Sequence, residues 1–217
     1  TEELVDKADS LTILAVGADE NLTVKLTITP VTKPGTSLVD RKWEFPDRPI
    51  LTAQDYQKRF PNLAFENSSK LENWNSSGNP IYEDSLKFTN GEARLDLAAS
   101  NWPVGHYRID WAYPDGTDGE SASFAVLDAE KSVLPAGVNY FTKVSNRNPK
   151  IGEIFTMTLV SSSTLPNVNA LWASRKGFKV VETTSEKKTV LSYTATDADR
   201  GGINLSIGFV HFNESHN

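Results

Sequence analysis

The sequence predicts an all-β protein made of two tandem antiparallel β-sandwich domains, the first with a long insertion that carries one short helix. Three observations support this prediction. Many short segments alternate apolar and polar residues, which is the pattern of half-buried strands. Turn signals separate these segments at intervals of about ten residues, as in antiparallel sandwiches. The 217 residues are enough for two domains that each bury a core.

The first half of the chain contains most of the expected strands. Residues 22–28 place four apolar side chains on one face and three polar ones on the other. Residues 107–113 and 121–126 alternate in the same way on either side of the turn PDGTDG, which predicts a hairpin. The remaining strands of this half are expected at 91–97 and, with weaker signals, near 11–16, 37–43 and 84–88.

Residues 44–83 form an insertion between two of these strands. Thr52 precedes the segment AQDY, with Asp55 three residues later, which is a variant of a capping box. Tyr56 and Phe60 share one helical face at i, i+4 spacing. The insertion is much longer than an ordinary loop, so we expect it either to be functional or to pack as a substructure.

A second domain follows an aperiodic stretch. Residues 129–137 are polar, contain Pro and Gly and lack periodicity, which predicts an interdomain linker. The first domain is therefore expected at 1–128 and the second at 138–217. Strand periodicity returns at 155–159, 168–172, 191–195 and 203–209.

Composition argues against several classes of function. The chain has 22 Lys and Arg against 28 Asp and Glu, a net charge of -6, and no basic run, so nucleic acid is not an expected partner. It has no Cys, which excludes disulfides, thiolate metal sites and Cys nucleophiles within this chain. No apolar run approaches the length needed to span a bilayer, so we expect no direct membrane insertion.

No catalytic or metal-binding constellation is evident. The three His residues lack metal-ligand spacing, and no nucleophile-elbow or nucleotide-binding motif occurs. The acidic turn DGTDGE lacks the full spacing of a calcium loop and lies where a hairpin turn is expected. Asp197 and Asp199 fit another turn. We therefore predict no catalytic residue, no cofactor and no metal, and expect that the chain is not an enzyme.

Aromatic residues offer an alternative function. Trp43, Trp74 and Trp102 lie near strand ends or in the insertion. A row of exposed rings on a sandwich can stack on sugars, so these residues are candidates for the surface of a secreted carbohydrate-binding or adhesin module. The favoured interpretation is that they cover the edge of the sandwich and anchor the insertion. Trp111 and Trp172 lie on strand faces and are expected in the cores.

Three segments together resemble the bacterial alpha-2-macroglobulin family, especially its members from Bacteroidetes. They are RKWEFPDRPILTAQDYQKRFPN, the ENW at 72–74, and NWPVGHYRIDW at 101–111. The first is similar to the family's Arg-x-x-Trp-Glu-x-Pro-Asp element, although Trp43 stands one position early. The third contains the Trp-Pro-x-Gly-x-Tyr pattern as Trp102, Pro103, Gly105 and Tyr107.

The second domain adds a weaker match. Gly152 and Glu153 match the family's x-Pro-Gly-Glu element before a strand, whereas Ile151 replaces its usual small or polar residue. The resemblance implies two consecutive macroglobulin-like domains, each a seven-stranded antiparallel sandwich of immunoglobulin-like type. It also implies that the second sandwich ends about one strand short.

Family membership implies a role within a much longer protein. Such proteins are exported and trap proteases, because cleavage of a bait segment triggers collapse around the protease, often with a reactive thioester. Neither element is in this sequence, so the resemblance implies a noncatalytic scaffold segment. Its expected location is periplasmic or cell-surface, tethered through a distant part of the parent protein. Its expected partners are neighbouring macroglobulin-like domains of the same chain and a target protease.

Overall fold

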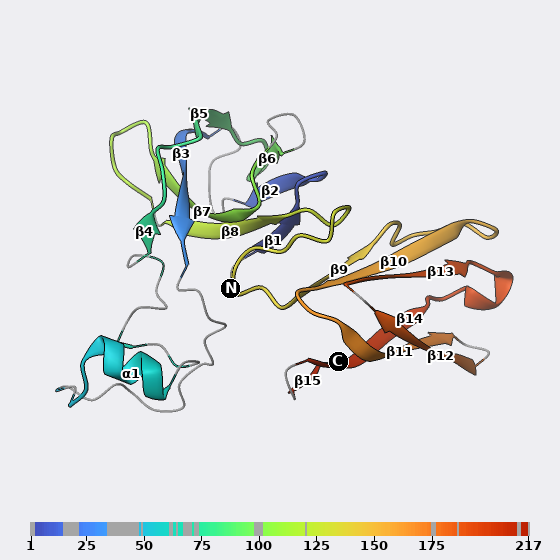
Figure 1. Ribbon diagram of the computed structural model, residues 1–217. Coiled ribbons are helices and arrows are strands. Elements are labelled where there is room, and N and C mark those ends of the chain that lie inside the picture. The colour runs from blue at the N-terminus through green and yellow to red at the C-terminus, as the bar shows by residue number, and fades with distance from the viewer. Residues whose placement is uncertain are drawn as a thin grey trace. The chain divides into compact units, whose positions relative to one another are not determined.

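The computed structural model describes most of the chain, and the chain divides into two compact units, Thr1–Val138 and Asn139–Asn217. The described residues are 3–14, 22–33, 48, 50–60, 63, 65–66, 71, 74–97, 102–119, 121–174, 177–185, 187–211 and 214–216. Both units consist of β-strands, and the first also carries one α-helix (Figure 1). The predicted fold class is confirmed.

The first unit is a sandwich of a large and a small sheet. The large sheet has the order β1 (Glu3–Asp6), β8 (Ala122–Leu127), β7 (Gly105–Ala112), β3 (Thr23–Thr32) and β4 (Asn75–Ser76), and β5 (Tyr82–Lys87) also pairs with β3. The small sheet pairs β2 (Ser10–Leu14) with β6 (Glu92–Asp96). One pair departs from the antiparallel expectation: β1 runs parallel to β8. Residues 7–9 then lead to β2 in the small sheet.

The strands predicted within the described residues of this unit are present. Residues 23–28 of the segment 22–28 lie in β3, and the expected hairpin is the antiparallel pair β7 and β8. The segments expected near 11–16, 84–88 and 91–97 correspond to β2, β5 and β6. The strand expected at 37–43 lies outside the described residues.

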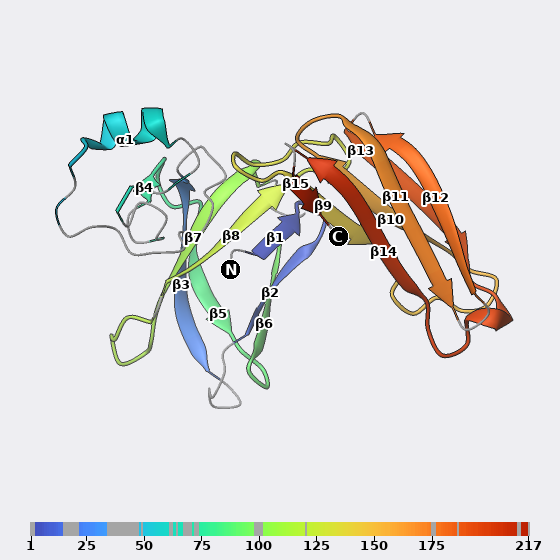
Figure 2. The ribbon, with the colours of Figure 1, turned by 90° about the horizontal axis from the view of Figure 1, so that it is seen from below.

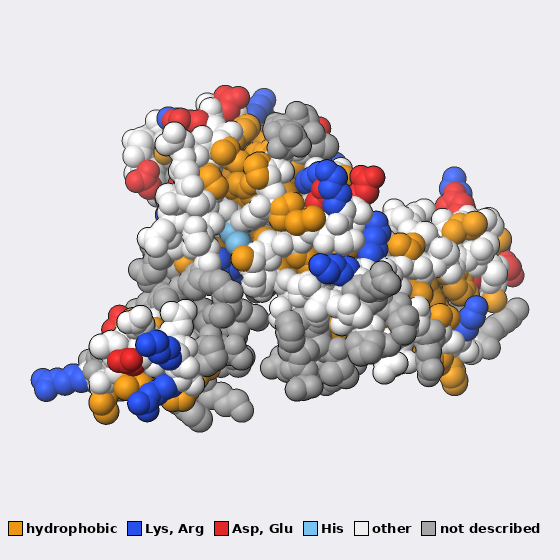
Figure 3. All heavy atoms as spheres, viewed as in Figure 1, with side chains coloured by type: hydrophobic (Ala, Val, Ile, Leu, Met, Phe, Trp, Pro, Cys, Tyr) orange, Lys and Arg blue, Asp and Glu red, His pale blue; other side chains and the backbone are white. Residues whose placement is uncertain are grey.

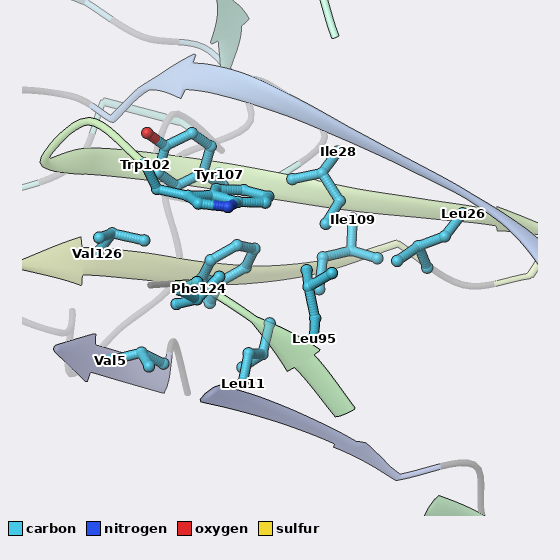
Figure 4. Packing of buried hydrophobic residues seen from close by; sticks show 11 residues of the cluster. Val5, Leu11, Leu26, Ile28, Leu95, Trp102, Tyr107, Ile109, Phe124 and Val126 are labelled. Atoms are coloured by element: carbon cyan, nitrogen blue, oxygen red, sulfur yellow. The ribbon is translucent and has the colours of Figure 1, made fainter. Parts of the chain in front are cut away.

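The core of the first unit lies between its two sheets. Leu11 of β2 and Leu95 of β6 pack against Leu26, Ile109 and Phe124 of the large sheet (Figure 4). All five side chains are buried. Complete burial of such a side chain contributes about 1.5 to 3 kcal/mol, which explains why the alternating pattern could locate these strands.

Tyr107 connects the core to the chain that leads into β7. Its hydroxyl donates a 2.6 Å hydrogen bond to the carbonyl of Pro103, four residues upstream, an arrangement known as a tyrosine corner. Its ring stacks on Phe124 at 5.3 Å and meets the edge of Trp102 at 5.2 Å (Figure 4). Burial raises the pKa of the hydroxyl to about 12. The Trp-Pro-x-Gly-x-Tyr pattern therefore has a packing role in this unit.

The hairpin turn between β7 and β8 depends on a close approach at Gly119. A Cβ added there would lie 1.6 Å from Nε1 of Trp111, which is partly buried against the core. The carboxylate of Asp115 accepts hydrogen bonds from the backbone N–H and the hydroxyl of Thr117, and these bonds lower its pKa. Asp115 thus stabilises the turn, as the hairpin interpretation of this segment predicts.

The predicted helix is present as α1 (Ala53–Arg59). The hydroxyl of Thr52 accepts a hydrogen bond from the backbone N–H of Asp55, so Thr52 is the N-cap. Tyr56 is the buried residue of the helix, and its ring contacts Phe60 at 5.0 Å and Phe65 at 5.5 Å. The insertion thus has a small aromatic cluster of its own, which agrees with packing as a substructure.

The second unit is a sandwich of three strands against four. One sheet has the order β13 (Lys188–Thr194), β10 (Ile154–Ser161), β9 (Tyr140–Val144). The other has the order β12 (Gly177–Ser185), β11 (Leu165–Ser174), β14 (Asn204–His211), β15 (Glu214–His216). All pairs are antiparallel. The four strands predicted here correspond to β10, β11, β13 and β14 (Figure 2).

The core of the second unit contains a central cluster and an aromatic stack. Met157 and Leu159 of β10 pack against the inward residues of β11 and β14, among them Val168 and Ile207. Trp172, which is buried as expected, stacks on Tyr193 at 4.9 Å. Hydrophobic side chains also reach the surface of both units, interspersed with charged ones, on the face drawn in Figure 3.

We predict that Tyr107→Phe lowers the free energy of unfolding of the first unit by about 1 to 2 kcal/mol. The substitution keeps the ring but removes the hydrogen bond to Pro103. Urea unfolding followed by tryptophan fluorescence measures the change. Tyr113→Phe is the matched control, because Tyr113 is 38% exposed and its change should be within about 0.5 kcal/mol. Equal effects of the two substitutions would contradict the role given to Tyr107.

Candidate functional site

The tryptophans that could form a sugar-binding surface are buried where the structure describes them. Trp102 is 3% exposed and Trp74 is 7% exposed. Stacking on a sugar requires an open ring face, so these two residues do not provide the surface on which the carbohydrate-binding alternative was based. Their indole N–H groups are buried with no hydrogen-bond partner among the described residues. Trp43 lies outside the described residues.

His106 lies at the start of β7 and contacts two segments that are distant from it in the sequence. Its ring is 4% exposed and meets the edge of Trp74, near the end of the insertion, at 5.9 Å. Its Nε2 lies 2.7 Å from the carbonyl oxygen of Ala136. The ammonium of Lys33 lies 5.3 Å from the centre of the Trp74 ring, in the geometry of a cation–π contact. His106 therefore contacts both the end of the insertion, through Trp74, and the segment before the second unit, through Ala136.

That segment, residues 129–137, was expected as an interdomain linker, but it belongs to the first unit. Asp128 and Val133 exchange two backbone hydrogen bonds, of 2.9 and 3.0 Å. The backbone N–H of Ala129 donates to the carboxylate of Asp6 at 3.4 Å, and Ala129 is buried. Because its polar groups bond to the first unit, we call residues 128–138 the junction and treat them as part of the sandwich.

An ion pair holds the start of the junction. The Lys7 ammonium lies 2.6 Å from the Asp128 carboxylate, whose side chain is only 4% exposed. The hydrogen bond from Lys7 lowers the pKa of Asp128 below its ordinary value, although burial acts in the opposite direction. The same hydrogen bond raises the pKa of Lys7. The backbone N–H of Lys131 also donates to this carboxylate at 3.0 Å, so two donors stabilise its charged form.

The second unit contains a hollow of about 460 Å³ at one end of the sandwich. Its lining includes apolar side chains of both sheets, Val144 and Phe155 from one and Leu205 from the other. Its rim carries two cationic side chains, Arg147 and Arg200. The sequence pattern did not indicate this cavity.

Glu153 organises the loop beside the hollow. Its carboxylate accepts a hydrogen bond from the backbone N–H of Lys150 at 2.8 Å and one from the side-chain amide of Asn146 at 3.3 Å. Gly152 has a φ of 87°, a left-handed conformation that glycine adopts without strain. The Gly-Glu pair singled out in the sequence therefore shapes this loop.

Asp199 stabilises the turn on the other side of the hollow. It ends a single 3-10 turn, Asp197–Asp199, and its carboxylate accepts bonds from the backbone N–H and the hydroxyl of Thr196 and from the Tyr193 hydroxyl. Burial favours the neutral acid, but these hydrogen bonds outweigh it and the pKa of Asp199 is lowered. Burial and the bond to Asp199 raise the pKa of Tyr193. The two aspartates lie in a turn before a strand, as predicted.

No three His, Asp or Glu side chains among the described residues converge in a way that could hold a metal ion. No described helix is long and apolar enough to cross a membrane.

We predict that Asp128→Asn destabilises the first unit at neutral pH, because it removes the charge that pairs with Lys7. The folded-state pKa of Asp128 is lowered, so its stabilisation is complete above the unfolded pKa of about 4 and is lost as the pH falls through the folded value. Urea unfolding between pH 7 and pH 3 should show a difference from wild type that shrinks below about pH 4. Asp118→Asn, an exposed position, is the control and should show little difference throughout. A difference for Asp128→Asn that does not change with pH would contradict this assignment.

We predict that Asp199→Ala lowers the stability of the second unit by about 1 to 2 kcal/mol, because the Thr196 and Tyr193 donors lose their acceptor. Asp197→Ala is the matched control in the same turn. Asp197 pairs with Arg200 at the surface, where an ion pair contributes at most about 1 kcal/mol. Thermal unfolding measures both, and a larger effect at Asp197 would overturn the ranking.

Comparisons with known proteins identify no family for this chain. No family model matches it, and no curated protein is significantly similar to it in sequence. Similar solved structures include fibronectin(III)-like modules of Clostridium thermocellum CbhA, with 11% identity, a TM-score of 0.28, and coverage of 100% of this chain and 85% of that chain. A segment of two fibronectin type III domains from chicken tenascin has 11% identity, a TM-score of 0.26 and coverage of 97% and 89%. An amphioxus IgVJ-C2 molecule has 14% identity, a TM-score of 0.23, and coverage of 98% of this chain and 95% of that chain.

Similarity at this level carries no functional argument. The description of the chain as two tandem immunoglobulin-like sandwiches therefore rests on its own strand pairing.

Proposed function

We propose that this chain is a noncatalytic scaffold segment of a large alpha-2-macroglobulin-like protein that traps or inhibits proteases. In this proposal the parent protein is exported and is periplasmic or at the cell surface. The partners of the segment are neighbouring macroglobulin-like domains of the same chain, and the target protease is a partner of the assembled protein.

The observation that supports the proposal is the packing role of the residues that carry the family resemblance. Trp102 and Tyr107 form the aromatic cluster of the first unit, and the carbonyl of Pro103 accepts the hydrogen bond of the tyrosine corner. Gly152 and Glu153 shape a loop of the second unit. These residues stabilise sandwiches, which is the task of a scaffold domain.

The junction adds a mechanical argument. A protein that collapses around a protease must pass a movement from one domain to the next, which requires that the connecting backbone be attached to at least one of them. Here the junction is attached to the first unit at Asp128 by an ion pair and at Ala136 by His106. A displacement of the backbone after Val138 would therefore act on β1, β7 and β8 together.

The reading frame that encodes the chain tests the proposal first. We expect further macroglobulin-like sandwiches beside this segment, together with a bait segment and, in many such proteins, a thioester domain. A frame without further sandwiches of this kind would contradict the proposal. A frame that joins this segment to carbohydrate-active domains would favour the alternative of a secreted carbohydrate-binding or adhesin module, for which Trp74 and Trp102 are buried.

A functional test uses the parent protein. Limited cleavage by a protease should compact it, which native electrophoresis detects as faster migration. We expect His106→Ala in the parent to leave cleavage intact but to reduce the compacted fraction, because it releases both Trp74 and Ala136. Tyr113→Phe is the control and should compact normally. Cleavage without any compaction of the wild-type protein would contradict the proposed function.

A further inference from the structure

The hollow of the second unit is built entirely from residues of that unit. Its volume of about 460 Å³ falls within the range of about 300 to 1,000 Å³ that is usual for small-ligand sites. Its lining comes from the loop between β9 and β10, from the loop between β13 and β14, and from the strands beside them. A ligand in the hollow would therefore contact both sheets of the sandwich.

An apolar wall lines the hollow and is held in place from behind. Phe155 is 5% exposed, and its ring meets the rings of Trp172 and Tyr193, each at 5.6 Å. Toward the solvent, Val144 is 37% exposed and Ile151 is 55% exposed. Exposed apolar side chains around a cavity mark a surface that an apolar group can cover.

Arg147 provides a cation beside this wall. Its side chain is exposed, and its guanidinium has no ion-pair or hydrogen-bond partner within the described part of the chain. The backbone around it is held, because Oδ1 of Asn146 accepts a hydrogen bond from the backbone N–H of Asn148 at 2.9 Å. The side-chain amide of Asn146 also donates to Glu153. Because hydrogen bonds already position this loop, binding at Arg147 costs less conformational freedom.

The described carboxylates beside the hollow already have partners. Asp199 and Glu153 each accept hydrogen bonds from their own loops, and Asp197 pairs with Arg200 at 2.5 Å. Among the described residues that line the hollow, Arg147 is thus the cation without a counter-charge. A ligand carboxylate can pair with it, because the planar guanidinium matches the two carboxylate oxygens.

We propose that the hollow binds a ligand with an apolar body and a single carboxylate. The apolar body lies against Phe155 and covers Val144 and Ile151, and the carboxylate pairs with Arg147. One negative charge is expected and not two, because Arg200 already pairs with Asp197. A free acid and the C-terminal residue of a peptide share this chemistry. The binding site is separate from the proposed scaffold role and does not depend on it.

The test titrates ligands into the full chain and follows its amide NMR spectrum at low ionic strength, because salt screens an exposed charge pair. The probes are phenylbutyrate, its uncharged analogue phenylbutanol, and butyrate, which lacks the ring. The variant is Arg147→Gln. The matched control is Lys150→Gln, which removes a positive charge from the same loop at a position outside the lining. It keeps the backbone N–H that bonds to Glu153.

We expect phenylbutyrate to shift the amide signals of Asn148, Ile151 and Gly202, with a dissociation constant of about 1 mM. Phenylbutanol should bind about fivefold more weakly, and butyrate at least about tenfold more weakly. Arg147→Gln should weaken binding of phenylbutyrate about fivefold and change that of phenylbutanol by less than about twofold. Lys150→Gln should change neither affinity by more than about twofold.

No shift at these amides, equal affinities for phenylbutyrate and phenylbutanol, or equal effects of the two substitutions would overturn the proposal. Unchanged signals of β11 in both variants show that the fold is kept. N-acetyl-alanylphenylalanine, which has a free carboxylate, distinguishes the two sources of the ligand. Tighter binding than that of phenylbutyrate would identify the C-terminal residue of a peptide, and equal or weaker binding would identify a free acid.

Discussion

The hydrogen bond from Tyr107 to Pro103, within the buried aromatic cluster, is the constraint on which the first unit depends. It fixes where β7 begins, and β7 lies between β3 and β8 in the large sheet. Because neighbouring residues of a strand point to opposite faces, the start of β7 serves two purposes. Tyr107 packs on Phe124 in the core, while His106 holds the end of the insertion through Trp74 and the junction through Ala136.

The second unit has the same architecture but a different distribution of constraints. Its polar interactions gather at the two loops beside the hollow, where Glu153 and Asp199 each accept several hydrogen bonds. The rings of Tyr140 of β9 and Phe209 of β14 meet at 5.0 Å and connect the two sheets. The hollow thus has hydrogen-bonded loops beside it and the buried ring of Phe155 in its lining.

Local pattern could predict most strands but not the long-range contacts. The alternation around Leu26 and Ile109 identified β3 and β7, because each has one buried face. β12 was missed because Phe178 and Val180 are largely exposed, so the strand lacks an apolar inner stripe. The Pro and Gly content of residues 129–137 indicated turns correctly but could not show that their backbone bonds to Asp6, 123 residues away. The favoured interpretation of Trp74 and Trp102 as packing residues agrees with their burial, but the sequence could not show that a hollow lies between β9 and β14.

The central claim is that the junction is a structural part of the first sandwich, so that the chain can act as a scaffold. Residue-resolved hydrogen exchange of the unmodified chain tests this most directly. We predict that the amides of Asp128 and Val133, whose residues bond to each other through their backbones, exchange nearly as slowly as those of β8. Exchange at these two amides as fast as at the exposed turn around Gly116 would show that the junction is a loose connection and not part of the sandwich.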